Sequence, residues 1–201
     1  MPSSLQNPIR ITAALLLLAM IAACQPYTLV KSGVRTPVAD GMTVAPQKSW
    51  NQLGAQFTGG LNDHVEVWTA DSQILNELVF VGGLDDGEKL FRNAASAPAF
   101  SADATVVDLA DFARKTLAAS AQSTPKELET KPIQFLGNDG VQTEFDLPYK
   151  DGTPGRALAA AAIKNGKLYM IIWRAVGDLY YNGRKSEVEE IIKTARIGTK
   201  A

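Results

Sequence analysis

The side chains that most often act in catalysis are scarce in this sequence. It contains one histidine, His64, and one cysteine, Cys24. Zinc sites built from several cysteine or histidine ligands are therefore excluded. A serine–histidine–aspartate arrangement remains formally possible around His64, but no G-x-S-x-G segment presents a serine nucleophile. The chain also has no P-loop and no G-x-G-x-x-G segment, so we predict no catalytic residue and no bound cofactor.

The densest acidic cluster is formed by Asp85, Asp86 and Glu88. Calcium prefers such oxygen ligands, but the spacing does not match an EF-hand loop and the ligands are too few. Because Asp-Asp-Gly is also a common turn sequence, we interpret this segment as a turn and predict no metal site. Glu144 and Asp146 share one face of a predicted strand, and we interpret them as solvated residues rather than as a glycosidase-like pair.

Four aromatic residues are further candidates for binding: Trp68, Trp173, Tyr180 and Tyr181. Aromatic side chains concentrate in binding hot spots, but they also fill protein cores. Trp173 lies in the middle of a predicted strand, where burial is expected. Trp68 shares a strand face with Glu66, so we predict a contact surface that contains His64 and Trp68.

The first 23 residues have the composition of a secretory signal peptide. A polar segment that ends at Arg10 precedes Ile11–Ala23, which carries no charge. A membrane-spanning helix needs about 20 apolar residues, and this shorter run is ended by Gln25 and Pro26. We therefore predict a cleaved signal peptide over residues 1–23 rather than a transmembrane helix.

The end of this segment, Ile21-Ala22-Ala23-Cys24, resembles the lipobox of bacterial lipoproteins. The resemblance implies cleavage before Cys24 and attachment of a diacylglyceryl group to its sulfur, which removes the thiol from Cys–His catalysis. The alternative, an ordinary secretory signal, would leave an unpaired exported thiol, which is unusual. Gln25 at the following position resembles lipoproteins that are sorted to the outer membrane of Gram-negative bacteria.

The composition is that of one globular domain with a short leader. The 201 residues carry a formal net charge of −1 and form no basic stripe, so nucleic acid is not an expected partner. Residues 24–40 show no periodicity and contain Pro26, Gly33 and Pro37, which predicts a flexible tether with a possible short strand around Tyr27–Val30. Residues 41–201 are then long enough for a single domain that needs no disulfide.

Alternating apolar residues predict an antiparallel sheet. Val65–Thr69 and Leu75–Gly82 form a predicted hairpin, and four further predicted strands follow later: Pro132–Leu136, Val141–Tyr149, Arg156–Lys164 and Leu168–Val176. Asn165-Gly166 is the strongest hairpin signal, because both residues tolerate positive φ. Ala159–Ala162 favours a helix by propensity, but its place before this turn favours a strand, and we interpret it as one.

Two helices are predicted to flank the sheet. The first begins after an N-cap at Asp108, with apolar residues at three- and four-residue spacing. The second begins at a capping box formed by Ser186 and Glu189 and ends before Gly198. Strands that are apolar on both faces need cover on both sides, so the sequence predicts an α+β fold with helices on both faces of an antiparallel sheet.

The second half of the predicted domain resembles the PsbP-like fold. The resemblance covers roughly Thr130–Ile197 and rests on the Asn165-Gly166 hairpin, the aromatic-rich strand after it, the Tyr180-Tyr181 pair and the closing helix. It implies an α/β/α sandwich that serves mostly as a binding or accessory module, and it implies no catalytic residues.

The sequence therefore indicates where the protein is located more clearly than what reaction or ligand it serves. We predict a non-enzymatic, lipid-anchored lipoprotein of the outer membrane that faces the periplasm and binds an envelope protein partner. One alternative is a binder of a small or lipid-like ligand in a pocket beside the sheet. A remote alternative is an envelope hydrolase that uses His64.

Overall fold

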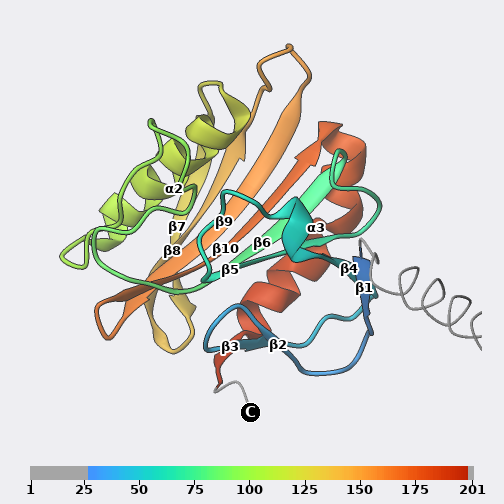
Figure 1. Ribbon diagram of the computed structural model, residues 1–201, viewed down its shortest axis with the longest axis horizontal. Coiled ribbons are helices and arrows are strands. Elements are labelled where there is room, and N and C mark those ends of the chain that lie inside the picture. The colour runs from blue at the N-terminus through green and yellow to red at the C-terminus, as the bar shows by residue number, and fades with distance from the viewer. Residues whose placement is uncertain (1–26, 199–201) are drawn as a thin grey trace, which may run out of the picture.

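The computed structural model describes residues 27–198, so Cys24 and the predicted signal peptide lie outside the described residues. An eight-stranded antiparallel sheet runs through the described part, with α2 and α3 against it (Figure 1). This arrangement confirms the predicted α+β fold class. No helix within residues 27–198 is long and apolar enough to cross a membrane.

The strand order in the large sheet is β1-β4-β5-β6-β10-β9-β8-β7. The strands of this sheet are β1 (Tyr27–Val30), β4 (Trp50–Leu53), β5 (Val65–Thr69), β6 (Asn76–Leu84), β7 (Lys126–Phe135), β8 (Asn138–Asp146), β9 (Gly155–Lys164) and β10 (Lys167–Val176). A smaller sheet contains β2 (Thr36–Val38), β3 (Met42–Val44) and β11 (Arg196–Ile197). The helices are the short 3-10 helix η1 (Ala55–Phe57), α2 (Val106–Ala121) and α3 (Gly177–Thr194).

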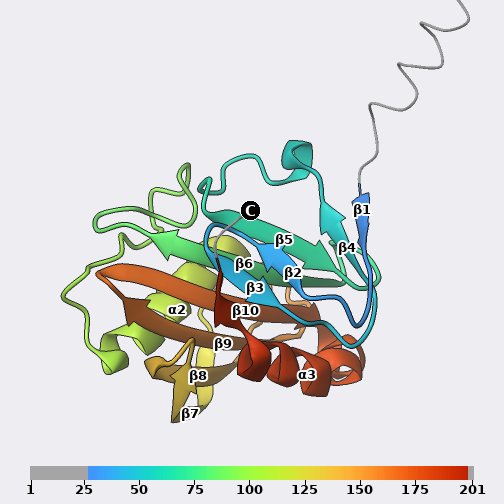
Figure 2. The same cartoon turned by 90° about the horizontal axis from the view of Figure 1, so that it is seen from below.

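The sheet separates two apolar cores, because successive side chains of a strand point to opposite faces. Ala157, Ala159 and Ala161 of β9 face α2, whereas Leu158 and Ala160 belong to the core under α3. The alanine segment is therefore a strand, as predicted, and its small side chains let both helices lie close. The smaller sheet shares the α3 face of the large sheet (Figure 2).

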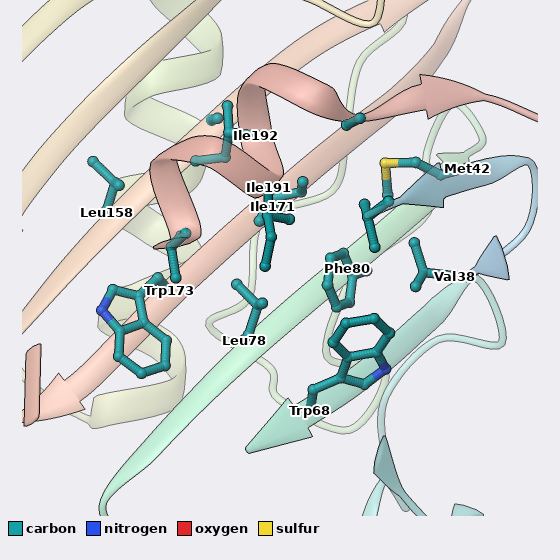
Figure 3. Close-up of a cluster of buried hydrophobic side chains, with 14 of the residues drawn as sticks. Val38, Met42, Trp68, Leu78, Phe80, Leu158, Ile171, Trp173, Ile191 and Ile192 are labelled. Atoms are coloured by element: carbon teal, nitrogen blue, oxygen red, sulfur yellow. The ribbon is translucent and has the colours of Figure 1, made fainter. Parts of the chain in front are cut away.

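The core on the α3 face is built around aromatic side chains (Figure 3). Trp68 and Phe80 pack edge to face with ring centroids 4.7 Å apart. Trp50 meets Trp173 edge to face at 5.8 Å. Trp68 is 0% exposed, so its predicted place on a contact surface is wrong. Val38 and Met42 of the smaller sheet lie beside it and help to cover the face that β5 was expected to expose.

The segment predicted as a tether is folded from its first described residue. Tyr27–Val30 pairs with β4, and Thr36–Val38 pairs with β3. Val30 and Val38 are buried in the core under α3. The start of the domain therefore moves from residue 41 to residue 27 at the latest. The possible short strand at Tyr27–Val30 is thus confirmed, whereas Thr36–Val38 is too short to produce a visible alternation in the sequence.

The helix starts also differ from the predictions. Thr105, not Asp108, is the N-cap of α2, and Asp108 completes a capping box from the third helical position. The last helix begins at Gly177, directly after β10, so the predicted start at Ser186 is wrong. The first turns of α3 are mostly polar, so they lack the apolar periodicity by which a helix is recognised in a sequence. Gly198 follows β11 rather than capping the helix.

Two tight turns shape the second half of the sheet. The β9–β10 hairpin turns at Asn165 and Gly166, whose φ angles of 53° and 73° confirm the prediction. The β7–β8 hairpin turns at Leu136 and Gly137, which also have positive φ, rather than across residues 137–140 as predicted. The two halves of the sheet meet where β6 pairs with β10.

Candidate functional site

His64 lies just before β5, where the β2–β3 turn approaches the large sheet. Its side chain is 27% exposed and lies between two carboxylates. The Nδ1 atom is 3.4 Å from Asp40 Oδ2, and the Nε2 atom is 3.8 Å from Glu88 Oε2. We call His64, Asp40, Asp85 and Glu88 the His64 cluster.

Asp40 is held in place by residues of β5 and β6. Glu66 accepts a hydrogen bond from the backbone N–H of Ala39 at 3.1 Å and another from Trp68 Nε1 at 2.6 Å. A side chain at Gly82 would collide with the backbone of Asp40, so only glycine permits this approach. Trp68 therefore supports the His64 cluster from the core side and contributes no exposed surface to it.

The turn after β6 supplies the other two carboxylates. The backbone N–H of Asp85 donates to Glu88 Oε2 at 2.9 Å. Lys167 Nζ lies 2.8 Å from Asp85 Oδ1, and this hydrogen bond lowers the pKa of Asp85. Asp86, which the sequence groups with them, instead accepts the backbone N–H of Ala102 at 2.9 Å. One donor atom each from His64, Asp85 and Glu88 lie within 4.8 Å of one another.

The geometry gives the hydrolase hypothesis no support. A general base works within about 2.6–3.2 Å of the proton that it takes. The two imidazole nitrogens of His64 face carboxylates, at 3.4 and 3.8 Å. Within residues 27–198, no serine or threonine hydroxyl is hydrogen-bonded to the imidazole.

A second feature is an apolar groove between α2 and the β7–β8 hairpin, which we call the α2–β7 groove. Its volume is about 340 Å³. The apolar lining consists of Val106, Val107, Ala110, Pro132 and Val141, and the rim carries Asp111, Arg114, Glu127 and Thr130. The groove exists because α2 packs mainly on β8 and β9, so the outermost strand extends past the helix.

The rim of this groove exposes apolar surface. Val107, which lines the groove at the first turn of α2, is 78% exposed. β7 is an edge strand, but Pro132 removes one backbone donor and alternating charged residues line its length. Such features protect an edge from pairing with another strand. Contacts to this region are therefore expected through side chains in the groove.

The carboxylate pair on β8 does not form the predicted solvated face. Glu144 is 9% exposed and accepts hydrogen bonds from Arg156 at 2.6 Å and from Lys185 at 2.7 Å. Burial alone would raise the pKa of Glu144, but these two partners outweigh it and lower the pKa. Because Lys185 belongs to α3, this network fastens the helix to the sheet. Asp146 remains more exposed, 3.6 Å from Arg156.

Sequence reasoning missed several residues of both features. Asp40 lies in the predicted tether, and Lys167 lies just before the predicted strand Leu168–Val176, where no pattern marks it. The adjacent Gly82 and Gly83 were the one local signal of a close approach: Gly83 has a φ of 87° and lies at a β-bulge opposite Leu168 and Tyr169. Bulges of this kind often re-aim side chains next to functional sites.

Comparisons with known proteins support the fold. No protein-family model matches the chain, and no curated protein matches it. The solution structure of cyanobacterial PsbP (CyanoP) from Synechocystis is similar, with a TM-score of 0.54 and 13% identity over 88% of this chain and 95% of that one. The Ran-binding protein Mog1p of Saccharomyces cerevisiae gives a TM-score of 0.50 and 9% identity over 88% and 97% of the two chains.

A third likeness is to LpqN of Mycobacterium tuberculosis, a protein involved in cell envelope biogenesis. It has 13% identity over 85% of this chain and 90% of that one, and its TM-score of 0.35 is too low to support an argument. At the identities of CyanoP and Mog1p, the likeness establishes a shared fold and nothing about activity. The PsbP-like fold predicted from the second half of the sequence is thereby confirmed for most of the chain.

Proposed function

We propose that this protein is a non-enzymatic binding module of the bacterial cell envelope, anchored by lipid and attached to a protein partner through the α2–β7 groove. The observation that carries the proposal is an open apolar groove whose rim exposes 78% of Val107. Contiguous exposed apolar surface with a polar rim is typical of protein interaction sites. The valines, alanine and proline that line the groove can bury apolar side chains of a partner but cannot act as acids or bases.

The shape of the groove favours a protein segment over a small ligand. Small-molecule sites occupy about 300–1,000 Å³ and enclose most of the ligand. The α2–β7 groove lies at the lower end of that range and opens at Val107. Arg114 and Asp111 place both charge signs on its rim. We therefore expect a partner segment that inserts one or two apolar side chains and carries charged residues beside them.

Site-specific photo-crosslinking in intact cells tests this proposal. With a photoreactive amino acid at Glu127 on the rim, we expect one reproducible adduct with an envelope protein. Adding Val107→Asp should reduce this adduct about tenfold, because loss of an apolar hot-spot contact typically costs more than 1 kcal/mol. The adduct yield is measured by immunoblot, and mass spectrometry identifies the partner. In the reciprocal experiment, a photoreactive amino acid placed in that partner should crosslink to the region around Glu127.

Leu179→Asp is the matched control. Leu179 is 80% exposed, as apolar as Val107, and lies on α3 outside the groove. An adduct that is equally abundant in the Val107→Asp and Leu179→Asp backgrounds would contradict a role for the groove. A lipid or small-molecule adduct at Glu127 would instead establish the alternative function, the binding of a lipid-like ligand.

The anchor is a separate part of the proposal and rests on Cys24, which lies outside the described residues. Each buried methylene contributes about 0.8 kcal/mol, and two or three acyl chains hold a protein stably on a membrane. Gln25 supports delivery to the outer membrane, with the domain in the periplasm.

Replacing Cys24 with serine should move the protein from the membrane fraction to the soluble periplasmic fraction and abolish labelling by radioactive palmitate. No other cysteine can accept the lipid, because Cys24 is unique. Cell fractionation and metabolic labelling measure the two effects. If the Cys24→Ser protein still incorporated palmitate and sedimented with membranes, the lipid-anchor proposal would fail.

A further inference from the structure

We propose that the His64 cluster binds a divalent transition-metal ion of the zinc type, with His64, Asp85 and Glu88 as ligands and Asp40 as the residue that orients the imidazole. The three ligands come from positions 64, 85 and 88 and are brought together by the pairing of β5 with β6. This site is independent of the α2–β7 groove, so it goes beyond the proposed function.

The distances suit a small cation. Zinc lies about 2.0–2.2 Å from nitrogen and oxygen ligands, which places two ligands of one ion about 3.4 Å apart in a tetrahedral site. His64 Nε2 and Glu88 Oε2 are 3.8 Å apart, and the three donor atoms all lie within 4.8 Å. A bound ion would draw the two carboxylates inward and so close these gaps. An imidazole among the ligands favours zinc over magnesium or calcium, which prefer oxygen.

The imidazole itself provides an observation that is independent of Asp85 and Glu88. Its Nδ1 atom is shielded from solvent and faces Asp40 Oδ2 at 3.4 Å. A metal-binding histidine almost always donates its second ring N–H to a carboxylate or carbonyl, which fixes the ring and leaves the other nitrogen for the metal. With the proton on Nδ1 toward Asp40, the lone pair of Nε2 points to the side of Glu88.

Lys167 makes the proposal testable in both directions. Its ammonium group contacts Asp85 Oδ1 and supplies positive charge beside the cluster when no metal is bound. A divalent cation has to compete with this charge. Removing the ammonium while keeping a polar side chain, as in Lys167→Gln, should therefore strengthen metal binding, whereas removal of a ligand should weaken it.

The experiment is a titration of the tag-free full chain with Zn²⁺, followed by isothermal calorimetry and by the shift in thermal midpoint. All variants carry Cys24→Ser, because a free thiol would itself bind zinc. We expect one ion per chain. His64→Ala should abolish binding, Asp40→Asn should weaken it about 10–100-fold, and Lys167→Gln should strengthen it about tenfold.

Asp86→Asn is the control, since Asp86 belongs to the same turn but lies outside the cluster and the amide keeps an acceptor for Ala102. Its affinity for Zn²⁺ should be unchanged. Near-UV circular dichroism shows whether each variant is folded, and Glu88→Gln replaces His64→Ala if that variant is not. Absence of saturable binding, or equal affinity in the Glu88→Gln and Asp86→Asn proteins, would overturn the proposal.

Discussion

Replacing Trp68 with alanine is expected to lower the free energy of unfolding by about 3–5 kcal/mol, the usual cost of truncating a large buried aromatic side chain. Trp68 is completely buried, packs on Phe80 at 4.7 Å and donates its indole N–H to Glu66. The variant loses these contacts, leaves a cavity and removes one hydrogen bond from Glu66. Urea denaturation followed by circular dichroism measures the change.

Two further variants show whether the effect comes from burial. Trp68→Phe keeps an aromatic ring but loses the indole donor, so its loss of stability should be smaller than that of Trp68→Ala. Leu179→Ala removes an apolar side chain that is 80% exposed, and its effect should stay within about 0.5 kcal/mol. If Trp68→Ala left the urea midpoint unchanged and weakened only partner binding, Trp68 would be a surface contact after all.

Replacing Glu187 with alanine is expected to cost a similar amount, about 3–5 kcal/mol, for an electrostatic reason. The side chain of Glu187 is 4% exposed and accepts hydrogen bonds from Lys48, Trp50 and Arg184. Its Oε1 accepts the backbone N–H of Lys48 and the Nε1–H of Trp50, each at 2.9 Å, and its Oε2 accepts Arg184 at 2.8 Å. Alanine leaves all three donors without this acceptor in a place that water reaches poorly.

Glu190→Ala is the matched control for Glu187→Ala, because both residues lie on α3. Glu190 is 43% exposed, and its ion pair with Lys193 spans 3.7 Å, so its loss should change stability by less than about 1 kcal/mol. Glu187→Gln keeps one carbonyl acceptor and should fall between the two. Thermal and urea unfolding of the three proteins give the order, and equal stabilities for Glu187→Ala and Glu190→Ala would refute this account.

The elements that could be predicted from sequence are those determined by neighbouring residues in the chain. Asn165 and Gly166 specify a tight turn by their own backbone preferences, and β10 is apolar on both faces from Leu168 to Trp173. A strand that is apolar on both faces must be covered on both sides, so the sequence alone predicts a sheet between two layers. The alanine segment of β9 could then be assigned as a strand from its position beside that turn.

The elements that escaped prediction depend on partners far away in the chain. β2 and β11 are only two or three residues long and pair with β3 from opposite ends of the chain, a sheet that no local pattern reveals. That sheet explains both the burial of Trp68 and the position of Asp40. His64, Asp85 and Glu88 were each noticed in the sequence, but their meeting requires the register of β5 on β6, where Val65 pairs with Val81.

The pairing of β6 with β10 also has a consequence for the time course of folding. Glu77 and Arg174 face each other across this seam although they are 97 positions apart, and they form a partly buried ion pair. Contacts of such long sequence separation close slowly, because the chain entropy between them must be lost first. The first half of the sheet thus has an open edge until β10 arrives. A chain that completes its core only with its last strands stays extended for longer, which suits the export across a membrane that we propose.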